Sequence, residues 1–410
     1  MDKNQQVLVD LLSAAIRDRK PELSFTRKID WEVIFGEAQA HQVEALIYPV
    51  LQKLDKDQIL NKDLLDRWKH VTLVKSYQQI QHLDRIGEVL QAFNNENIPV
   101  IALKGLVLRD FYLFPELRTM CDADLLIHKK DLAIAKTVLF DMGYTATTEP
   151  NPKHIGFNHK FYPLIEIHWT LVDPGTVISS ATLEDSIWQN TKPVPISGVQ
   201  ALSLSNEDQL LSLLLHMANH FIFSGFGLRN LCDLVELIEN KNIHINWDYF
   251  LLKSKECNIE KFTLAIFLCC KKLFQINFPD LFDFHIIEND PYLNELQQDI
   301  FLSKDSTTNK IALDLAGGQL RTVNRGKNNK IQSKYKFLFS FLFPKPQKLE
   351  FKFQYAHKYP ILYPIACFHR LFIGRKYWRN TSFSEKIHLL KEAELIAQQR
   401  SQLLQWLNLY

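Results

Sequence analysis

Residues 101–127 read IALKGLVLRDFYLFPELRTMCDADLLI, a stretch in which two apolar runs enclose a glycine turn and a short helical pattern. The first run ends at Lys104-Gly105. The second run carries Asp122 and Asp124 at its start. Side chains at i and i+2 of a β-strand point to the same face, so the two carboxylates should project together while the alternate positions face a core.

Two like charges side by side at the start of an apolar strand are unfavourable unless a cation lies between them. Asp122 and Asp124 therefore predict a divalent-metal site for Mg²⁺ or Mn²⁺, and phosphate chemistry is the first expected use of such a site. A third ligand is expected from the run 163–169, where Glu166 and His168 share one face of a strand. If that strand pairs with the aspartate strand, Glu166 reaches the same metal. His168 is interpreted as a structural residue or as a partner of a ligand.

The composition is that of an ordinary globular protein. The chain has 410 residues, 46% hydrophobic and 23% charged, which predicts two or three domains. Its six cysteines show no metal-type spacing, which is typical of reduced thiols in a cytoplasmic protein. The first residues are polar, and no apolar run approaches the roughly 18 residues of a membrane span, so neither a secretory signal nor a transmembrane helix is expected.

Periodicity predicts four regions: a helical region 1–95, a mixed α/β core 96–200, a helical domain 201–320 and a basic, aromatic-rich helical region 321–410. Asp30 is expected to cap a helix that starts at Trp31. The other expected helices cover 63–93, 106–113, 131–142, 206–218, 228–238, 259–274 and 384–407. The expected strands cover 99–103, 124–127, 144–148 and 163–171.

At these residues the chain resembles the DNA-polymerase-β-like nucleotidyltransferases, and within them the bacterial family labelled uncharacterised nucleotidyltransferases. The shared order is a glycine turn and helix, then Asp-x-Asp on a strand, then a lone acid on a later strand. The resemblance covers residues 25–375 and implies an α+β fold, a small mixed sheet flanked by helical N- and C-terminal regions and mostly α overall. The segments that carry it are 103–105, 112–118, 122–127, 165–169 and 216–233.

The resemblance also implies roles for single residues. Asp122, Asp124 and Glu166 would be catalytic and would hold the metal, with Glu166 helping to deprotonate the acceptor. Lys104 stands in the turn where the superfamily commonly has Gly-Ser, so its charge would replace a missing hydroxyl. Arg118 is a candidate phosphate clamp. The candidate nucleotide-binding residues are Lys104, Gly105 and Arg118.

The implied activity is metal-dependent transfer of a nucleoside monophosphate from an NTP to a hydroxyl-bearing acceptor, with release of pyrophosphate. The acceptor would be a small molecule, a sugar, a peptide, a protein or an RNA. One alternative is phosphoryl transfer by the same metal site. The other is a non-catalytic binding protein that acts through residues 321–379.

The segment 321–379 holds fourteen Lys and Arg but one acid, Glu350, and it is interleaved with aromatic residues. Such a segment suits an anionic partner such as nucleic acid, or a membrane surface. It equally suits a helical subdomain whose aromatics form a core and whose lysines are solvated. All three interpretations remain open from the sequence.

Three further pairs have simpler interpretations. His216 and His220 have a spacing that can bind zinc, but no third ligand is evident, so helix packing is favoured and a substrate contact stays open. Arg229 and Asp233 are expected to form an ion pair along a helix, with a place in the cleft as the alternative. Cys269-Cys270 is expected in a core. Neither a P-loop nor a dinucleotide-binding glycine motif is found.

Overall fold

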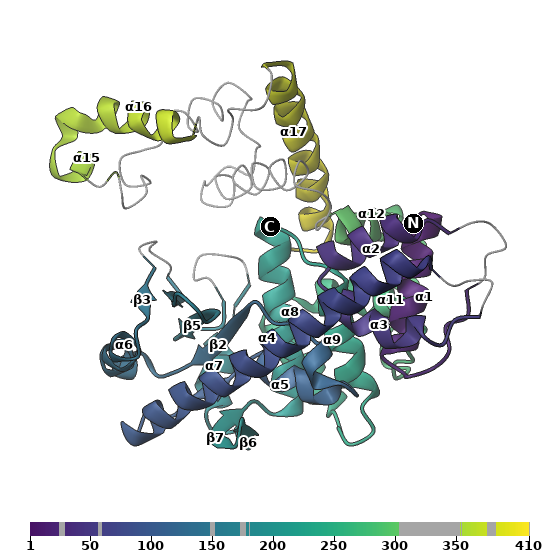
Figure 1. Ribbon diagram of the computed structural model, residues 1–410, viewed down its shortest axis with the longest axis horizontal. Helices are drawn as coiled ribbons and strands as arrows, with labels where there is room; N and C mark the ends of the chain where they lie inside the picture. The colour runs from purple at the N-terminus through teal and green to yellow at the C-terminus, as the bar shows by residue number, and fades with distance from the viewer. Residues whose placement is uncertain are drawn as a thin grey trace.

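The computed structural model describes residues 1–23, 29–55, 60–147, 152–172, 178–179, 181–302, 353, 355–374 and 383–409. Within these residues the chain is mostly helical, around one seven-stranded mixed sheet of order β3-β4-β5-β2-β1-β7-β6 (Figure 1). The expected α+β class is therefore confirmed. Most of the basic segment 321–379 lies outside the described residues, so the expectations for it stay predictions.

The elements have the following bounds. The α-helices are α1 (Lys3–Ala15), α2 (Trp31–Ala40), α3 (Glu44–Leu51), α4 (Lys62–Asn95), α5 (Gly105–Leu108), α6 (Leu132–Asp141), α7 (Ala181–Ile187), α8 (Asn206–Phe223), α9 (Leu228–Glu239), α10 (Trp247–Glu256), α11 (Glu260–Phe274), α12 (Pro291–Leu302), α15 (Tyr355–Lys358), α16 (Tyr363–Gly374) and α17 (Phe383–Trp406). The strands are β1 (Ile101–Ala102), β2 (Asp122–Leu126), β3 (Thr145–Ala146), β4 (His154–Asn158), β5 (Leu164–His168), β6 (Lys192–Ile196) and β7 (Val199–Ser203).

Most of the expected elements are present, with two differences. Asp30 caps α2 by accepting a hydrogen bond from the Val33 N–H, and the long expected helix is α4. The helix expected over 106–113 is shorter, because α5 ends at Leu108 and a 3₁₀ turn follows. Strands β4, β6 and β7 were not predicted. The described strands all fall between residues 101 and 203, close to the expected core of 96–200, whose boundaries stay a prediction.

Strand β2 lies in the middle of the sheet and aligns the charged residues. It runs parallel to β5, with Asp124 opposite Glu166, and antiparallel to β1. Strand β5 in turn pairs antiparallel with β4, which sets His154 opposite His168. Because directly paired residues share a face of a sheet, the carboxylates of β2 and β5 and both histidines project to the same side. The pairing of the two acidic strands, on which the expected Glu166 ligand depended, is therefore present.

The opposite face of the sheet is apolar and packs on helices α4 and α6. Leu125, Ile165 and Ile167 are fully buried in one cluster with Leu90 of α4 and Leu139 of α6. Burying a side chain of this size stabilises the fold by about 1.5–3 kcal/mol. This packing fixes which face of β2 is apolar, and it leaves the Asp122 face toward α8 and α9.

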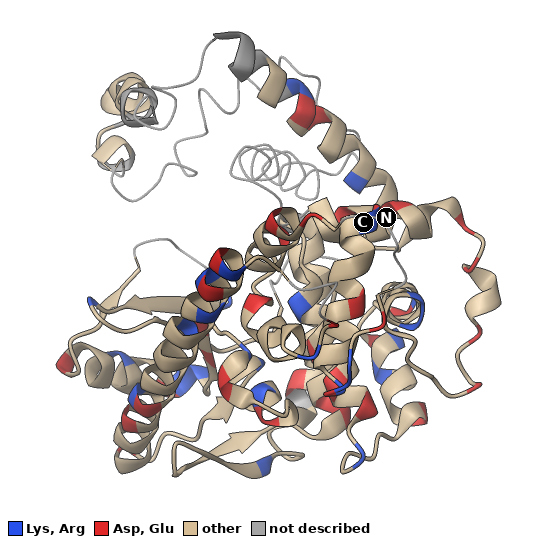
Figure 2. Ribbon diagram, turned by 45° about the vertical axis from the view of Figure 1, so that its right-hand side comes forward, with Lys and Arg blue, Asp and Glu red and all other residues tan. Residues whose placement is uncertain are grey.

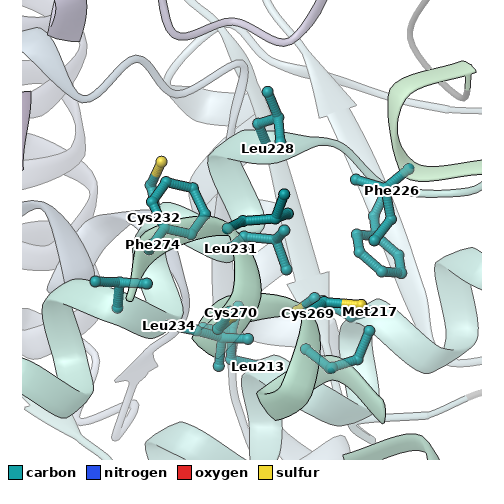
Figure 3. Close-up of a cluster of buried hydrophobic side chains, with 14 of the residues drawn as sticks. Leu213, Met217, Phe226, Leu228, Leu231, Cys232, Leu234, Cys269, Cys270 and Phe274 are labelled. Atoms are coloured by element: carbon teal, nitrogen blue, oxygen red, sulfur yellow. The ribbon is translucent and has the colours of Figure 1, made fainter. Parts of the chain in front are cut away.

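Helices α8, α9 and α11 form a second core beside the sheet (Figure 3). Met217 of α8, Leu231 of α9 and Cys270 of α11 are fully buried in it, as is Cys269. The expected core position of Cys269-Cys270 is confirmed, and all six cysteines are free thiols. The same cluster continues into α1 and α3, so the N-terminal helices support the wall that α8 and α9 present to the sheet.

Acidic and basic residues are interspersed along the long helix α4 (Figure 2). This helix therefore carries charges of both signs along its length. Across the described part of the chain, no helix combines the length and the apolar character needed to cross a lipid bilayer.

Glu236 of α9 should make the stability of the protein depend on pH. Burial, followed by the charges of Asp233 and Glu239, raises the pKa of Glu236 from 4.5 to about 8. The folded state thus keeps a proton that the unfolded chain releases, so this contribution is present below pH 4.5 and is lost as the pH rises through 8. In denaturant unfolding, the stability of Glu236→Gln relative to the wild type should increase by roughly 4 kcal/mol between pH 5 and pH 9.

The same substitution at the exposed Glu260 of α11 is the control and should leave the pH profile unchanged. Parallel pH profiles for the wild type and Glu236→Gln would contradict the prediction.

Candidate functional site

A cleft separates the charged face of the sheet from helices α8 and α9. Asp122 and Asp124 line it from β2, and Lys104 and Gly105 line it from the turn before α5. Helix α9 contributes Arg229 to the opposite wall of the cleft. The two expected metal-binding aspartates and the glycine turn therefore lie together, as the alternation of the strand required. The other lining residues used below are Gln42, Arg118, Met120, His216, His220 and Asp233.

Asp124 is buried and neutralised by neighbouring side chains. Its Oδ1 lies 2.7 Å from Lys104 Nζ and 2.8 Å from His168 Nε2. Burial alone would raise the pKa of Asp124, but Lys104 and His168 hold it well below the ordinary value. Burial likewise opposes the charge on Lys104, and the carboxylates of Asp124 and Asp122 raise its pKa. Lys104 therefore acts as an internal cation for one of the two aspartates.

Lys104 reaches this position through an unusual backbone conformation. Its φ is +51°, a region that residues with a side chain rarely adopt. The strain is of order 1–3 kcal/mol and persists only where surrounding structure enforces it. Here the ion pair with the buried Asp124 supplies that constraint.

The carboxylate of Asp122, unlike that of Asp124, has no hydrogen-bond or ion-pair partner within the described part of the chain. Burial, and then the adjacent charge of Asp124, raise the pKa of Asp122 above its ordinary value. A second carboxylate that faces a cleft without a cation of its own is a donor that suits a divalent metal. The donor set at β2 thus fits Mg²⁺ or Mn²⁺, which prefer oxygen ligands.

Glu166 lies beside Asp124 but is held by two histidines. Its Oε2 is 3.2 Å from His168 Nε2, and its Oε1 is 3.5 Å from His154 Nε2. His168 Nε2 also contacts Asp124 Oδ1. The distance between Asp124 Oδ1 and Glu166 Oε2 therefore cannot exceed the sum of their distances to this nitrogen. Burial would raise the pKa of Glu166, whereas the His168 hydrogen bond lowers it. Glu166 does not line the cleft, so its direct contact with a cleft metal stays a prediction.

Arg118 belongs to a buried network that the sequence did not predict. Its Nε lies 3.0 Å from Asp233 Oδ1, its Nη2 contacts Asp233 Oδ2, and Tyr112 donates a 2.8 Å hydrogen bond to the same carboxylate. Burial opposes the guanidinium charge, but Asp233 raises the pKa of Arg118. The role of Arg118 as a phosphate clamp stays a prediction, and in the structure this side chain fastens α9 to the segment before β2.

The expected ion pair between Arg229 and Asp233 is wrong. Asp233 pairs with Arg118 instead, while Arg229 donates to the Gln42 side chain and, over 2.9 Å, to the Thr119 carbonyl. Spacing along one helix predicted a local pair, but a buried carboxylate is paired by whichever cation is buried with it. Arg229 and Asp233 both line the cleft, which was the alternative interpretation of this pair.

His216 and His220 line the cleft from α8. Their rings are arranged edge to face, with 4.2 Å between the ring centroids. Burial, together with the charge of Lys104, lowers the pKa of His216 well below its ordinary value. The low pKa favours a neutral imidazole at His216. A helix-packing role and a substrate contact both stay predictions for His216 and His220.

Gly105 is required by close packing at the turn. A Cβ at this position would lie 2.4 Å from Arg118 Nη1 and 2.8 Å from Met120 Cγ. This crowding gives a physical reason why the turn differs from the Gly-Ser expected in the superfamily. Gly105→Ala should lower the free energy of unfolding by about 1–3 kcal/mol, as overpacking does.

Gly36 of α2 is the matched control, because a Cβ there meets no atom within 4 Å. Gly36→Ala should therefore stabilise the protein by about 0.5–1 kcal/mol, which thermal or denaturant unfolding measures directly. Equal effects of the two substitutions would contradict the packing argument.

His154 is the site residue that sequence reasoning missed. It lies on β4, and its ligand atom groups with those of Glu166 and His168 within 4.8 Å. Its place opposite His168 depends on the register of two strands, which no local spacing encodes. A pair of histidines on neighbouring strands was the available signal, once β4 had been recognised as a strand.

Curated sequences and solved structures were the first two sets of known proteins compared with this chain. Curated protein sequences yielded no match. Among solved structures, a lincosamide antibiotic adenylyltransferase, LnuA, with lincomycin bound is 17% identical, with a TM-score of 0.26 over 38% of this chain and 94% of that one. An antigenic nucleotidyltransferase-like protein from Paracoccidioides brasiliensis is 12% identical, with a TM-score of 0.30 over 53% of this chain and 93% of that one.

The match to a protein family is more extensive. Residues 27–275, which include every strand of the sheet and helices α2 to α11, match the family described as "Uncharacterised nucleotidyltransferase". The matched segment holds both cleft aspartates, Glu166 and the glycine turn. The chain belongs to this family of nucleotidyltransferases.

Proposed function

We propose that the protein transfers a nucleoside monophosphate from an NTP to a hydroxyl group of an acceptor and releases pyrophosphate. The observation that carries the proposal is the pair Asp122 and Asp124, which line one cleft together with Lys104, Gly105 and Arg229. Carboxylates beside cations are what a metal–triphosphate complex requires, since the metal needs oxygen ligands and the phosphates need positive charge.

Asp122 and Asp124 would hold Mg²⁺ or Mn²⁺, and Glu166 would support them from the neighbouring strand. When bound, the metal supplies neutralising charge at the phosphates and lowers the pKa of the acceptor hydroxyl. Lys104, already 2.7 Å from Asp124, carries the ammonium that a phosphate oxygen can share. Arg229 is a second cation in the same cleft, and Gly105 lets a ligand approach the backbone closely.

The reaction joins the acceptor oxygen to the α-phosphorus and breaks the bond from that phosphorus to the bridging oxygen of pyrophosphate. The acceptor proton must pass to a base in the cleft. We assign this role to Asp122, because its carboxylate is unpartnered within the described residues and lines the cleft. Glu166, the acid expected to help, has both oxygens directed at histidines. The protein's own contribution is positioning and charge.

The test is incubation of the full chain with each α-³²P-labelled NTP, Mg²⁺ and pools of hydroxyl-bearing small molecules, sugars, peptides, proteins or RNA. The expected result is a labelled acceptor and one pyrophosphate for each label transferred. A nucleoside diphosphate product would assign the site to phosphoryl transfer. If no NTP binds in the presence of Mg²⁺, the proposal is wrong, and a non-catalytic role is favoured.

Removal of the metal is a separate prediction. Chelation by EDTA should abolish pyrophosphate release, and excess Mg²⁺ or Mn²⁺ should restore it, because the carboxylates of Asp122 and Asp124 line the cleft. Full activity after exhaustive chelation would contradict the predicted role of Asp122 and Asp124.

A further inference from the structure

A second group of metal-binding side chains lies next to Asp124, toward the β4 edge of the sheet. His154 comes from β4, and Glu166 and His168 come from β5. His154 is opposite His168 in the antiparallel register, and Glu166 precedes His168 by two residues, so all three side chains leave the same face. One ligand atom of each lies within 4.8 Å of those of the other two.

Two of the contacts among these side chains have lengths close to those in a small coordination sphere. His168 Nε2 lies 3.2 Å from Glu166 Oε2, and His154 Nε2 lies 3.5 Å from Glu166 Oε1. Ligands at 2.0–2.1 Å from a tetrahedral zinc are about 3.3 Å from one another. The histidine–carboxylate contacts are thus near this spacing, and a cation would draw together ligand atoms that already lie within 4.8 Å of one another.

The strands that carry these residues are fixed on both sides. Strand β5 pairs with β2 along one edge and with β4 along the other, so the backbone positions are set by two ladders. The His168 side chain is 3% exposed, and those of His154 and Glu166 are 15% and 19% exposed. Ligands held on paired strands and largely shielded from water form a preorganised site.

We propose that His154, Glu166 and His168 bind a divalent cation of the zinc class, at a position separate from Asp122. Two imidazole nitrogens and one carboxylate are a donor set found for zinc, whereas Mg²⁺ prefers oxygen ligands only. Asp124 Oδ1, which is 2.8 Å from His168 Nε2, adjoins this group of three ligand atoms without being part of it. The proposal stands on this geometry and does not depend on nucleotidyl transfer.

The carboxylates of β2 and β5 would then serve two cation positions, one for Mg²⁺ and one for a zinc-class ion. A zinc-class ion would neutralise Glu166 and fix the imidazoles beside Asp124, while Asp122 stays free for Mg²⁺. Glu166 is the one side chain that both proposals use. The cation at the histidines would thus organise the carboxylates of β2 and β5.

Direct metal binding tests this proposal without an activity assay. The full chain is stripped with a chelator, dialysed and titrated with Zn²⁺ against a chromophoric competitor, and its metal content is then measured. We expect one equivalent of Zn²⁺ per chain. The variants His154→Ala and His168→Ala should bind it at least about 100-fold more weakly, since loss of a ligand exceeds the 10–100-fold cost of losing an outer-shell partner.

Two controls separate this site from others. His285→Ala removes a histidine that is 92% exposed and should leave Zn²⁺ binding unchanged. Asp122→Asn removes a proposed Mg²⁺ ligand and should also keep the bound Zn²⁺, so loss of transfer activity and loss of Zn²⁺ are distinguishable. X-ray absorption of the zinc-loaded wild type should show imidazole and carboxylate ligands, which covers the case of a histidine variant that does not fold.

Absence of stoichiometric Zn²⁺ binding by the wild type would overturn the proposal. Wild-type affinity in both histidine variants, or sulfur ligation in the absorption spectrum, would overturn it as well. In each of these cases the histidines act only as hydrogen-bond partners of Glu166 and Asp124.

Discussion

Asp122→Asn should abolish pyrophosphate release while making the protein more stable. Transfer is expected to fall by a factor of at least about 100–1,000, because the variant removes a charge that the transition state requires. The stability should rise, since burial and the charge of Asp124 already raise the pKa of Asp122 and penalise its ionised form. A residue that harms stability and is needed for activity has the signature of a functional group.

Asp124→Asn gives the informative contrast. It should lose activity to a similar extent, but it should also destabilise the protein, because Lys104 and His168 lose the carboxylate that both contact. An uncompensated buried charge costs about 3–5 kcal/mol. Opposite shifts of the melting temperature, with equal loss of transfer, are therefore expected from two neighbouring aspartates.

Pyrophosphate release and thermal unfolding measure both effects, and Asp141→Asn is the control because Asp141 is an exposed residue at the end of α6. Transfer at the wild-type rate by Asp122→Asn would remove the central residue from the proposed function. Destabilisation by both variants alike would instead identify Asp122 as a structural residue.

The sequence predicted the residues of the site better than it predicted their partners. Alternation along a strand is a local property, so it was enough to place Asp122 with Asp124 and Glu166 with His168 on common faces. The pairing of β2 with β5 entered the sequence argument only as a condition, and the structure supplies it. These features depend on period and burial, which a single sequence carries.

The missed strands had weak or conflicting signals. Strand β6 contains Pro193 and Pro195, which argue against a strand, although the Ser197-Gly198 turn with positive φ at both residues is typical of a hairpin. Strand β4 is short and contains Gly156, a residue that weakens strand patterns. Because β4 was not predicted, the position of His154 beside Glu166 was not predicted either.

Long-range polar pairing was the other failure. The spacing of Arg229 and Asp233 predicted a local pair, yet Asp233 is paired by Arg118 from another part of the chain. Spacing along a helix predicts which side chains are able to contact each other on its surface. Burial decides which groups must meet, because a carboxylate that is 1% exposed needs a buried partner. Such a partner is set by the tertiary fold and has no local pattern.

Arg118→Leu should be among the most destabilising single substitutions in this protein. The side chains of Arg118 and Asp233 are 5% and 1% exposed, and two hydrogen bonds join them. Among the described residues, removing the guanidinium leaves the buried Asp233 with only the Tyr112 hydroxyl as a side-chain donor, at an expected cost of about 3–5 kcal/mol. Tyr112→Phe, which removes one hydrogen bond, should cost about 1 kcal/mol in the same denaturant titration.

The double variant Arg118→Leu with Asp233→Leu separates the two roles of this arginine. Replacing both charges of a buried pair by apolar side chains is often neutral or stabilising, so the double variant should recover most of the lost stability. Its affinity for an NTP with Mg²⁺ then reports on the cleft alone. Recovered stability with wild-type affinity would make Arg118 a positioning residue that ties α9 to the segment before β2. Recovered stability with lost affinity would support the phosphate clamp, whereas failure to recover stability would show that the pair does more than neutralise charge.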